Sequence, residues 1–176
     1  MAQTVLHDEH VKLGASFTDF GGWDMPVRYS SDLLERHAVR NAAGLFDISH
    51  MAELFISGTD ASAFLDAALV GMASEIAIGR AKYSMICNSE GGIIDDLIVY
   101  RLETERFLII ANASNREAVA NALRNRKAGF DVQVDDQSDE WALLAIQGPK
   151  ATGILQRLAS TDLAELKYYS IAESTV

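Results

Sequence analysis

The 176-residue sequence has few residues of several types, and each shortage excludes a class of protein. Its single cysteine, Cys87, cannot form a disulfide within the chain, and the apolar stretch around it favours a buried, inert thiol over a nucleophile or redox sensor. Two prolines, 49% hydrophobic residues and 23% charged residues are typical of a globular protein, not a disordered one. Because no apolar run reaches the length of a membrane span, we expect a soluble protein.

The sequence also has few positively charged residues. The chain carries 15 Lys and Arg against 25 Asp and Glu, a net charge of −10, so we expect no nucleic-acid partner. The lack of a long apolar run leads us to expect no membrane partner. The opening MAQTVLHDEH has neither a secretory apolar core nor an Arg-rich presequence. We therefore expect a cytoplasmic protein, or one of an organelle matrix if a leader has been removed.

The four histidines show no spacing typical of metal ligands. No HxxxH or HExxH pattern and no cysteine partner is present, so we expect no metal site. Each histidine is expected to be structural: His7, His10, His37 and His50.

What the sequence does contain is a pair of carboxylates inside an apolar stretch, GGIIDDLIVY at residues 91–100. The stretch predicts a strand with both faces covered, where an ionised carboxylate needs partners or a raised pKa. Side chains alternate along a strand, so Asp96 and Tyr100 share one face and Asp95 lies on the other. The two aspartates are therefore not a close acid/base dyad, and one is expected to hold structure while the other does chemistry.

The N-terminal third predicts two helices and a loop. Leu6, His10, Leu13 and Phe17 recur at roughly helical spacing, and FGGWDMPVRY then reads as an anchored loop or as a pocket wall. Residues 32–43 predict a helix, with a capping box and a left-handed stop at its ends and three residues facing inward. The box is Asp32 with Glu35, the stop is Gly44, and the inward residues are Leu33, His37 and Ala38.

Residues 45–136 predict a strand, a helix, three strands, a helix and a strand. The first strand covers 45–57, Thr59 and Asp60 cap the first helix, and a tight hairpin joins AKYSMICN to the carboxylate strand. Ser114 and Glu117 form a capping box for the second helix, which ends near Gly129. This order is a split βαβ pattern of the ferredoxin-like kind with one added strand.

The predicted fold class is α+β, with antiparallel sheets and flanking helices. We expect a ferredoxin-like domain, 49–138, inserted in a partial Greek-key α+β domain made of 1–48 and 139–176. In the last segment a strand, a helix starting at Gly148-Pro149 and a final strand at YYSIAESTV are expected.

Four stretches, in order and spacing, resemble the aminomethyltransferases, or T-protein, of the glycine cleavage system. They are FGGWDMPVRY, GLFDISHM, AKYSMICNSEGGIIDDLIVYRL and ALLAIQGPKA. The resemblance implies transfer of an aminomethyl group from the lipoyl arm of H-protein to tetrahydrofolate, with release of ammonia. It also implies a three-domain ring around a central folate site, in which 1–48 and 139–176 form part of the first, folate-binding domain. Because family members continue past Val176, we expect this chain alone to bind folate weakly and not to turn over.

The resemblance also implies the site residues. Asp96 falls beside the reactive pterin nitrogens as the catalytic carboxylate, Ile110 and Asn112 on folate-contacting positions, and Met51, Tyr83 and Tyr100 on the pterin cavity. Purely structural alternatives are a carboxylate bonded to strand-edge amides for Asp96 and a turn or helix-start residue for Asn112. Two other functions stay open: a related folate-dependent demethylase or dehydrogenase domain, and a non-catalytic folate-binding module.

Overall fold

The computed structural model describes residues 1–175 and divides into two compact units. Unit 1 comprises Met1–His50, Ala142–Glu165 and Glu173–Val176, and unit 2 comprises Met51–Trp141 and Leu166–Ala172. The domain bounds expected from the sequence stay a prediction. The units differ from them most at Leu166–Ala172, which groups with unit 2.

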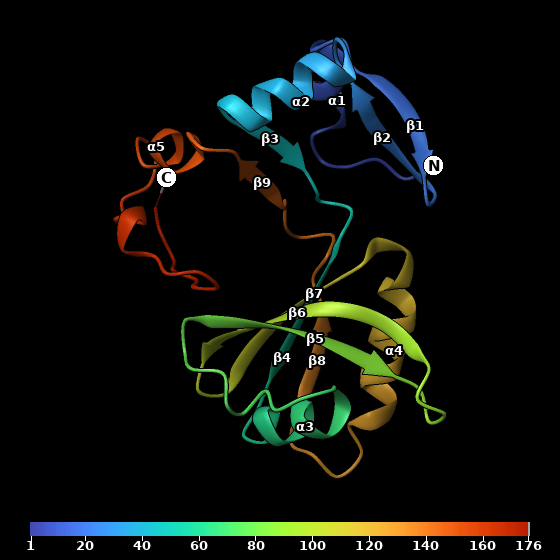
Figure 1. Ribbon diagram of the computed structural model, residues 1–176. Helices are drawn as coiled ribbons and strands as arrows, with labels where there is room; N and C mark the ends of the chain where they lie inside the picture. The colour runs from blue at the N-terminus through green and yellow to red at the C-terminus, as the bar shows by residue number, and fades with distance from the viewer. Residues whose placement is uncertain (176) are drawn as a thin grey trace. The chain divides into compact units, whose positions relative to one another are not determined.

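Unit 2 contains a five-stranded antiparallel sheet in the order β5-β6-β7-β4-β8 (Figure 1). Without the edge strand β5, this is the order of the ferredoxin-like arrangement, which agrees with the predicted α+β class and the added strand. None of the described helices is long and apolar enough to cross a membrane. The elements of unit 2 are β4 (Ala52–Ser57), α3 (Ala61–Ala68), β5 (Arg80–Cys87), β6 (Ile93–Glu103), β7 (Arg106–Ala111), a 3₁₀ turn (Ala113–Asn115), α4 (Arg116–Arg126) and β8 (Gln133–Asp136).

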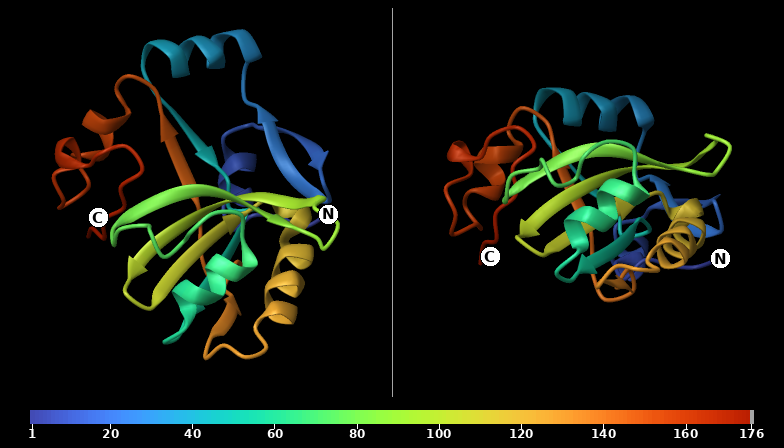
Figure 2. Two further views of the ribbon diagram at one scale, coloured as in Figure 1. Left: turned by 60° about the horizontal axis from the view of Figure 1, so that its bottom comes forward. Right: turned by 90° about the horizontal axis from the view of Figure 1, so that it is seen from below.

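Helices α3 and α4 cover one face of this sheet (Figure 2). Phe64 of α3 and Leu123 of α4 are fully buried against alternate strand residues, and burying each such side chain stabilises the fold by about 1.5–3 kcal/mol. The strand residues of this core include Leu54, Ile56, Leu97, Val99, Phe107 and Ile109. On the opposite face Tyr83 and Asp96 are exposed, which shows that this face is less covered. The expectation that both faces of the carboxylate strand are covered is therefore wrong.

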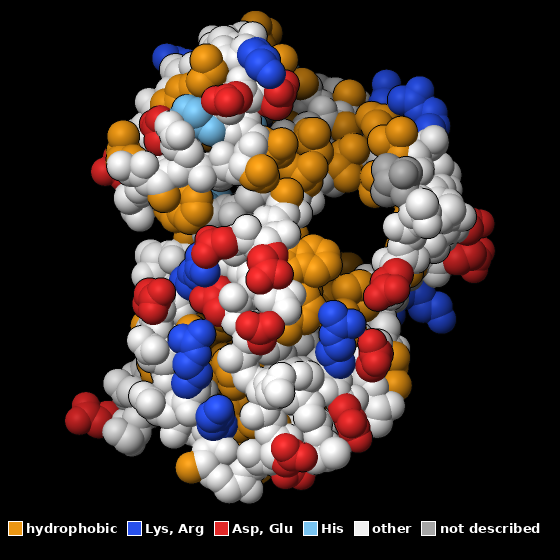
Figure 3. Space-filling view, turned by 180° about the vertical axis from the view of Figure 1, so that it is seen from behind, with side chains coloured by type: hydrophobic (Ala, Val, Ile, Leu, Met, Phe, Trp, Pro, Cys, Tyr) orange, Lys and Arg blue, Asp and Glu red, His pale blue; other side chains and the backbone are white. Residues whose placement is uncertain are grey.

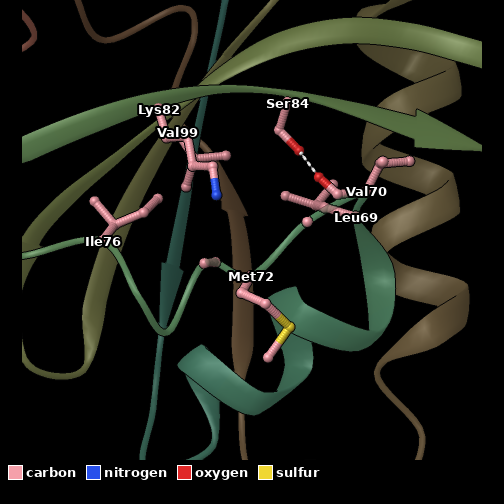
Figure 4. A pocket seen from close by; sticks show the side chains of 9 residues that line it. Leu69, Val70, Met72, Ile76, Lys82, Ser84 and Val99 are labelled. Carbon is pink, nitrogen blue, oxygen red and sulfur yellow. Dashed lines mark hydrogen bonds between the residues drawn. The ribbon is translucent and has the colours of Figure 1, made fainter.

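A small hollow lies beneath β5, and a hydrogen bond at this hollow fixes the connection between α3 and β5 (Figure 4). The Ser84 hydroxyl donates a hydrogen bond of 2.6 Å to the carbonyl oxygen of Val70, and Lys82 lies at the rim. Its volume of about 10 Å³ has room for a single water molecule. We therefore regard it as a packing feature rather than a ligand site.

Unit 1 contains two two-stranded antiparallel sheets, β1-β2 and β3-β9. The Gly pair at residues 21–22 has φ of +62° and +90°, which suits the type I′ turn of a tight hairpin. FGGWDMPVRY is therefore a hairpin rather than the predicted loop, and Phe17 lies in its first strand rather than on a helix. The elements are α1 (His7–Lys12), β1 (Ser16–Phe20), β2 (Trp23–Arg28), α2 (Asp32–Asn41), β3 (Gly44–Asp47), β9 (Leu144–Gln147), α5 (Ala151–Leu155) and a 3₁₀ turn (Leu163–Glu165).

A chain of hydrogen bonds anchors the end of this hairpin. The Tyr29 hydroxyl lies 2.7 Å from Nδ1 of His10, whose Nε2 lies 3.0 Å from Oδ2 of Asp47. Burial alone would raise the pKa of Asp47, but hydrogen bonds from Ser49, Thr4 and His10 outweigh it and lower the pKa. The bonded carboxylate fixes β3 to α1 and to the hairpin.

The hairpin is also the wall of a hollow, which agrees with the pocket-wall interpretation of FGGWDMPVRY. Pro26, Val27 and Tyr29 line a hollow of about 250 Å³ together with residues of α2 and β3. In the view of Figure 3, hydrophobic side chains gather in unit 1, and charged side chains are spread over both units. Exposed hydrophobic residues of unit 1 include Leu33, Leu34, Leu45 and Phe46.

Several details around α2 and β3 differ from the predictions. The N-cap of α2 is Ser31, whose Oγ accepts from the amide of Leu34, and not Asp32. Glu35 accepts instead from the amides of residues 29 and 30, ahead of the helix. Gly44 begins β3 and lacks a left-handed φ. The predicted inward residues Leu33, His37 and Ala38 are exposed.

The strand predicted over 45–57 is two strands, β3 and β4, in different sheets.

The other predicted caps also differ. Thr59 donates to a carboxylate oxygen of Asp131, and Asp60 accepts from the Asp131 amide, so neither side chain caps α3. The predicted box of Ser114 and Glu117 is replaced by the 3₁₀ turn ahead of α4. Among the described residues near the C-terminus, the predicted final strand is reduced to one bridge between Arg80 and Ser170.

Gly58 offers a test of the packing at the end of β4. Its φ is +134°, and a Cβ there would lie 2.2 Å from the carbonyl oxygen of Asp131. We expect Gly58→Ala to lower the free energy of unfolding by more than ~2 kcal/mol, because backbone conformation and close approach both oppose a side chain. The matched control is Gly129→Ala, where φ is +90° but nothing lies within 4 Å. It should cost ~1 kcal/mol. Urea denaturation measures both, and equal losses would contradict the steric argument.

Candidate functional site

The structure brings three of the predicted site residues together at the start of β6. The Tyr83 hydroxyl donates to Oδ2 of Asp96. The side-chain amide of Asn112, just after β7, donates to Oδ1 of Asp96 at 3.2 Å and to its carbonyl oxygen at 3.0 Å. In the part of the chain that the structure describes, no Lys or Arg forms an ion pair with Asp96. The carboxylate is thus held by neutral donors, and its negative charge faces outward unpaired.

Asp95 is bonded quite differently from its neighbour. It is 3% exposed and accepts hydrogen bonds from the Asn112 amide N–H at 2.9 Å, from Asn112 Nδ2 at 3.0 Å and from Asn115 Nδ2 at 2.6 Å. These bonds fix the turn that leads from β7 into α4. Asn112 is thus a turn residue, and its side chain is also a partner of both aspartates. Its contact with folate stays a prediction.

Strand register brings Tyr83 within reach of Asp96. Tyr83 pairs with Ile98 and Met85 pairs with Asp96 in the antiparallel β5–β6 ladder. An aromatic side chain reaches the diagonal neighbour on the same face, which is how the Tyr83 hydroxyl meets the carboxylate. The register shifts by one residue beyond Ile86, so a bulge lies next to the aspartate pair, as is common beside functional sites.

The hydroxyl of Tyr83 is a stable donor at neutral pH. The hydrogen bond to Asp96, followed by loss of hydration and the nearby negative charge, raises the pKa of Tyr83. Ionisation would place a second negative charge against the carboxylate, which is unfavourable. The phenol therefore stays protonated and oriented.

The other predicted site residues form apolar surface beside this cluster. Ile110 pairs with Ile98 and is 8% exposed, and Tyr100 shares the same face two residues further along β6. Burial raises the pKa of Tyr100. Met51 directly precedes β4, and continued alternation places it on the face of Glu53. These side chains offer an apolar surface without an acid or base of their own at neutral pH.

Sequence reasoning missed two residues of this region, Asn115 and Glu53. Glu53 is 3% exposed, and neither carboxyl oxygen has a hydrogen-bond partner among the described residues. Burial raises the pKa of Glu53 to about 7, with Arg116 opposing and Asp136 and Asp139 adding to the rise. The pattern that could have revealed Glu53 is the one used for the aspartates, an acid inside the apolar stretch AELFIS.

No group of three or more His, Cys, Asp or Glu within residues 1–175 is arranged to hold a metal ion. Cys87, predicted to be buried, is partly exposed at the end of β5, and its carbonyl oxygen accepts a hydrogen bond from Arg126. The arrangement around Asp96 can instead stabilise a positive charge or accept a proton on an apolar face.

Two matched substitutions separate the roles of the aspartates. We expect Asp95→Asn to lower the free energy of unfolding by about 1.5–3 kcal/mol, because an amide nitrogen would replace a buried oxygen that accepts one or two of these hydrogen bonds. Asp96→Asn should change it by less than ~0.5 kcal/mol, since that side chain is exposed. Chemical denaturation of the two variants measures the difference. Similar losses would show that Asp96 is a structural residue.

Comparison with known proteins gives a consistent match. The chain matches the family described as GCVT N-terminal domain over residues 6–176. It is 55% identical over 174 residues to an aminomethyltransferase of Saccharopolyspora erythraea, covering 99% of this chain and 47% of the relative. The crystal structure of glycine cleavage system aminomethyltransferase T from Bartonella henselae is 39% identical, with a TM-score of 0.87 over 96% of this chain and 46% of that chain.

A more distant likeness concerns the fold alone. The heterotetrameric sarcosine oxidase of Corynebacterium sp. U-96 is 20% identical, with a TM-score of 0.51 over 74% of this chain and 64% of that chain. The chain spans about half the length of the curated relatives it matches, 47% in the case of the Saccharopolyspora protein.

Proposed function

The chain belongs to the GCVT N-terminal domain family, and from that premise we propose that it serves aminomethyl transfer in the glycine cleavage system. The donor in this proposal is the lipoyl arm of H-protein, the acceptor and co-substrate is tetrahydrofolate, and ammonia is released. The observation that carries the proposal is the exposed carboxylate of Asp96, oriented by Tyr83 and Asn112.

The chemistry makes use of a fixed negative charge. The carbon–sulfur bond of the donor breaks with its electron pair on sulfur, which leaves an iminium-like carbon that N5 of the folate captures. The bond from this carbon to ammonia then breaks, and N10 of the folate bonds to the carbon with loss of its proton. Asp96 stabilises the positive charge as it develops, and it can relay a proton as ammonia leaves. Holding both partners together removes an entropic barrier on the order of several kcal/mol.

The surrounding residues have supporting roles in this proposal. Tyr83 and Asn112 orient the carboxylate, so little reorganisation is needed during reaction. Met51, Tyr100 and Ile110 supply apolar surface for the pterin and keep water away from the charge. Asp95 holds the turn that carries Asn112.

The test of Asp96 needs a protein of full family length. We would join this chain to the remaining half of the Saccharopolyspora relative and add tetrahydrofolate with H-protein carrying the aminomethyl group. Asp96→Asn should lower the rate of methylenetetrahydrofolate formation about 100-fold while changing folate affinity much less, because its charge acts on the transition state. Asp8→Asn, an exposed change on α1, is the control. Turnover near that of the parent would remove Asp96 from the mechanism.

The same assay distinguishes the other functions. Folate binding without product would favour a non-catalytic folate-binding module, and turnover of an N-methylated amine would favour a demethylase. The expectations that residues 1–176 alone bind folate weakly without turnover, and that the protein is cytoplasmic, stay predictions.

A further inference from the structure

Glu53 is the second residue of β4, which lies between β7 and β8 (Figure 1). Its backbone is fully bonded: the amide donates to Oγ of Ser138 at 2.9 Å, and the carbonyl accepts from the amide of Gln137 at 3.0 Å. On the β7 side it pairs with Ile110. The position of the residue is therefore fixed, and only its side chain lacks partners.

The charged groups around Glu53 do not neutralise it. Arg116 of α4 is already occupied, since its Nε donates to Asp136 of β8 at 2.9 Å and its two terminal nitrogens donate to Asp139 at 2.9 Å each. Strand β7 contributes apolar Ile110 at this point. An ionised carboxylate buried without a partner is strongly unfavourable, so the neutral acid is the form that fits this environment.

The segment 137–141 is tied to this part of β4 through the backbone of Glu53 and ends in a half-exposed tryptophan. The indole ring of Trp141 lies 5.7 Å from the ring of Phe55, which is two residues beyond Glu53 on the same face of β4. The indole N–H donates to Oε1 of Gln137 at 3.1 Å. Residues 137–139 are held by Ser138, which is 5% exposed, and by the two bonds from Arg116 to Asp139. Trp141 is 52% exposed, so its ring can shift more readily than the core strands.

We propose that Glu53 is a positioning residue for the face that carries Asp96: its neutral carboxyl keeps Ile110 and the segment 137–141 in place, and its ionisation displaces them. Cross-strand pairing links Glu53 to Ile110 and Ile110 to Ile98, so a change at Glu53 reaches the surface beside Asp96 within two strand spacings, about 10 Å. The effect on a folate ligand rests on the proposed function, whereas the movement of the segment does not.

The sign of the pH effect follows from the raised pKa. The ordinary pKa of a glutamate is 4.5, and that of folded Glu53 is about 7, so the folded protein holds an additional proton between these values. The stability gained from this proton is fully present below pH 4.5 and is lost as the pH rises through about 7. Above that pH the protein carries a buried charge that favours displacement of Ile110 and of the segment 137–141.

Trp141 provides a direct readout. In a Trp23→Phe background it is the remaining tryptophan of the two, and its fluorescence should change between pH 5.5 and 8.5 with a midpoint near 7. Adding Glu53→Gln should abolish the transition, while Glu90→Gln, an exposed change in the β5–β6 turn, should keep it. Persistence in Glu53→Gln, or no transition in the parent, would overturn the proposal.

Thermal unfolding supplies a second measurement. The melting temperature of Glu53→Gln relative to the parent should increase from pH 5 to pH 8, and Glu53→Met should behave alike because it also lacks the charge. A constant difference across this range would contradict the proposal. Failure of both variants to fold at every pH would show that the carboxyl is purely structural, which also overturns it.

The link to the ligand is tested by calorimetric titration of the joined protein of full family length with tetrahydrofolate at pH 6 and pH 8. The affinity of the parent should fall at least threefold at the higher pH, while that of Glu53→Gln stays constant. An equal fall in both proteins would overturn the coupling to the ligand face. Absence of tetrahydrofolate binding at either pH would count against the proposed function, and the fluorescence transition would still decide the role of Glu53.

Discussion

The side-chain amide of Asn112 is the contact on which the rest of the site depends. It donates to both Asp95 and Asp96, which lie on opposite faces of one strand. A buried carboxylate such as Asp95 is tolerated only when its oxygens are bonded, and Asn112 with Asn115 meets that need. The same amide holds Asp96 in the orientation in which Tyr83 also meets it. When the turn after β7 forms, Asn112 therefore also orients the exposed carboxylate of Asp96.

Three acidic residues with different environments lie within a small part of unit 2. Asp95 is buried and bonded, Asp96 is exposed and bonded, and Glu53 is buried without a partner. Their side chains carry the same functional group, so the differences come from strand alternation and from the neighbouring donors. Such separation lets one sheet combine a structural anion, an anion available to a ligand and an acid that is neutral below about pH 7.

The sequence was sufficient to predict the features that depend on local pattern. The β5–β6 hairpin, the alternation around Asp96 and the strand–helix order of unit 2 follow from alternating apolar residues and from glycine positions. The split between β3 and β4 could not be found this way, because membership of different sheets is decided by distant partners, β9 and β7. The predicted caps were wrong because Ser31 accepts from the Leu34 amide at the start of α2, and because the side chains of Thr59 and Asp60 bond to Asp131. Glu53 was not predicted as a site residue, although it is an acid inside the apolar stretch AELFIS, as the aspartates are inside theirs.

The turn between β5 and β6 has a consequence for how this region can vary. Asn88 accepts from the amides of Glu90 and Gly92 and closes the turn, while the bulge beside it sets which side chains face each other. One inserted residue would send Tyr83 to the helix side of the sheet and leave Asp96 without its phenol. The residue types in this turn can therefore vary, but its length is restricted. Insertions that keep Tyr83 and Asp96 on the same face would have to add two residues at a time.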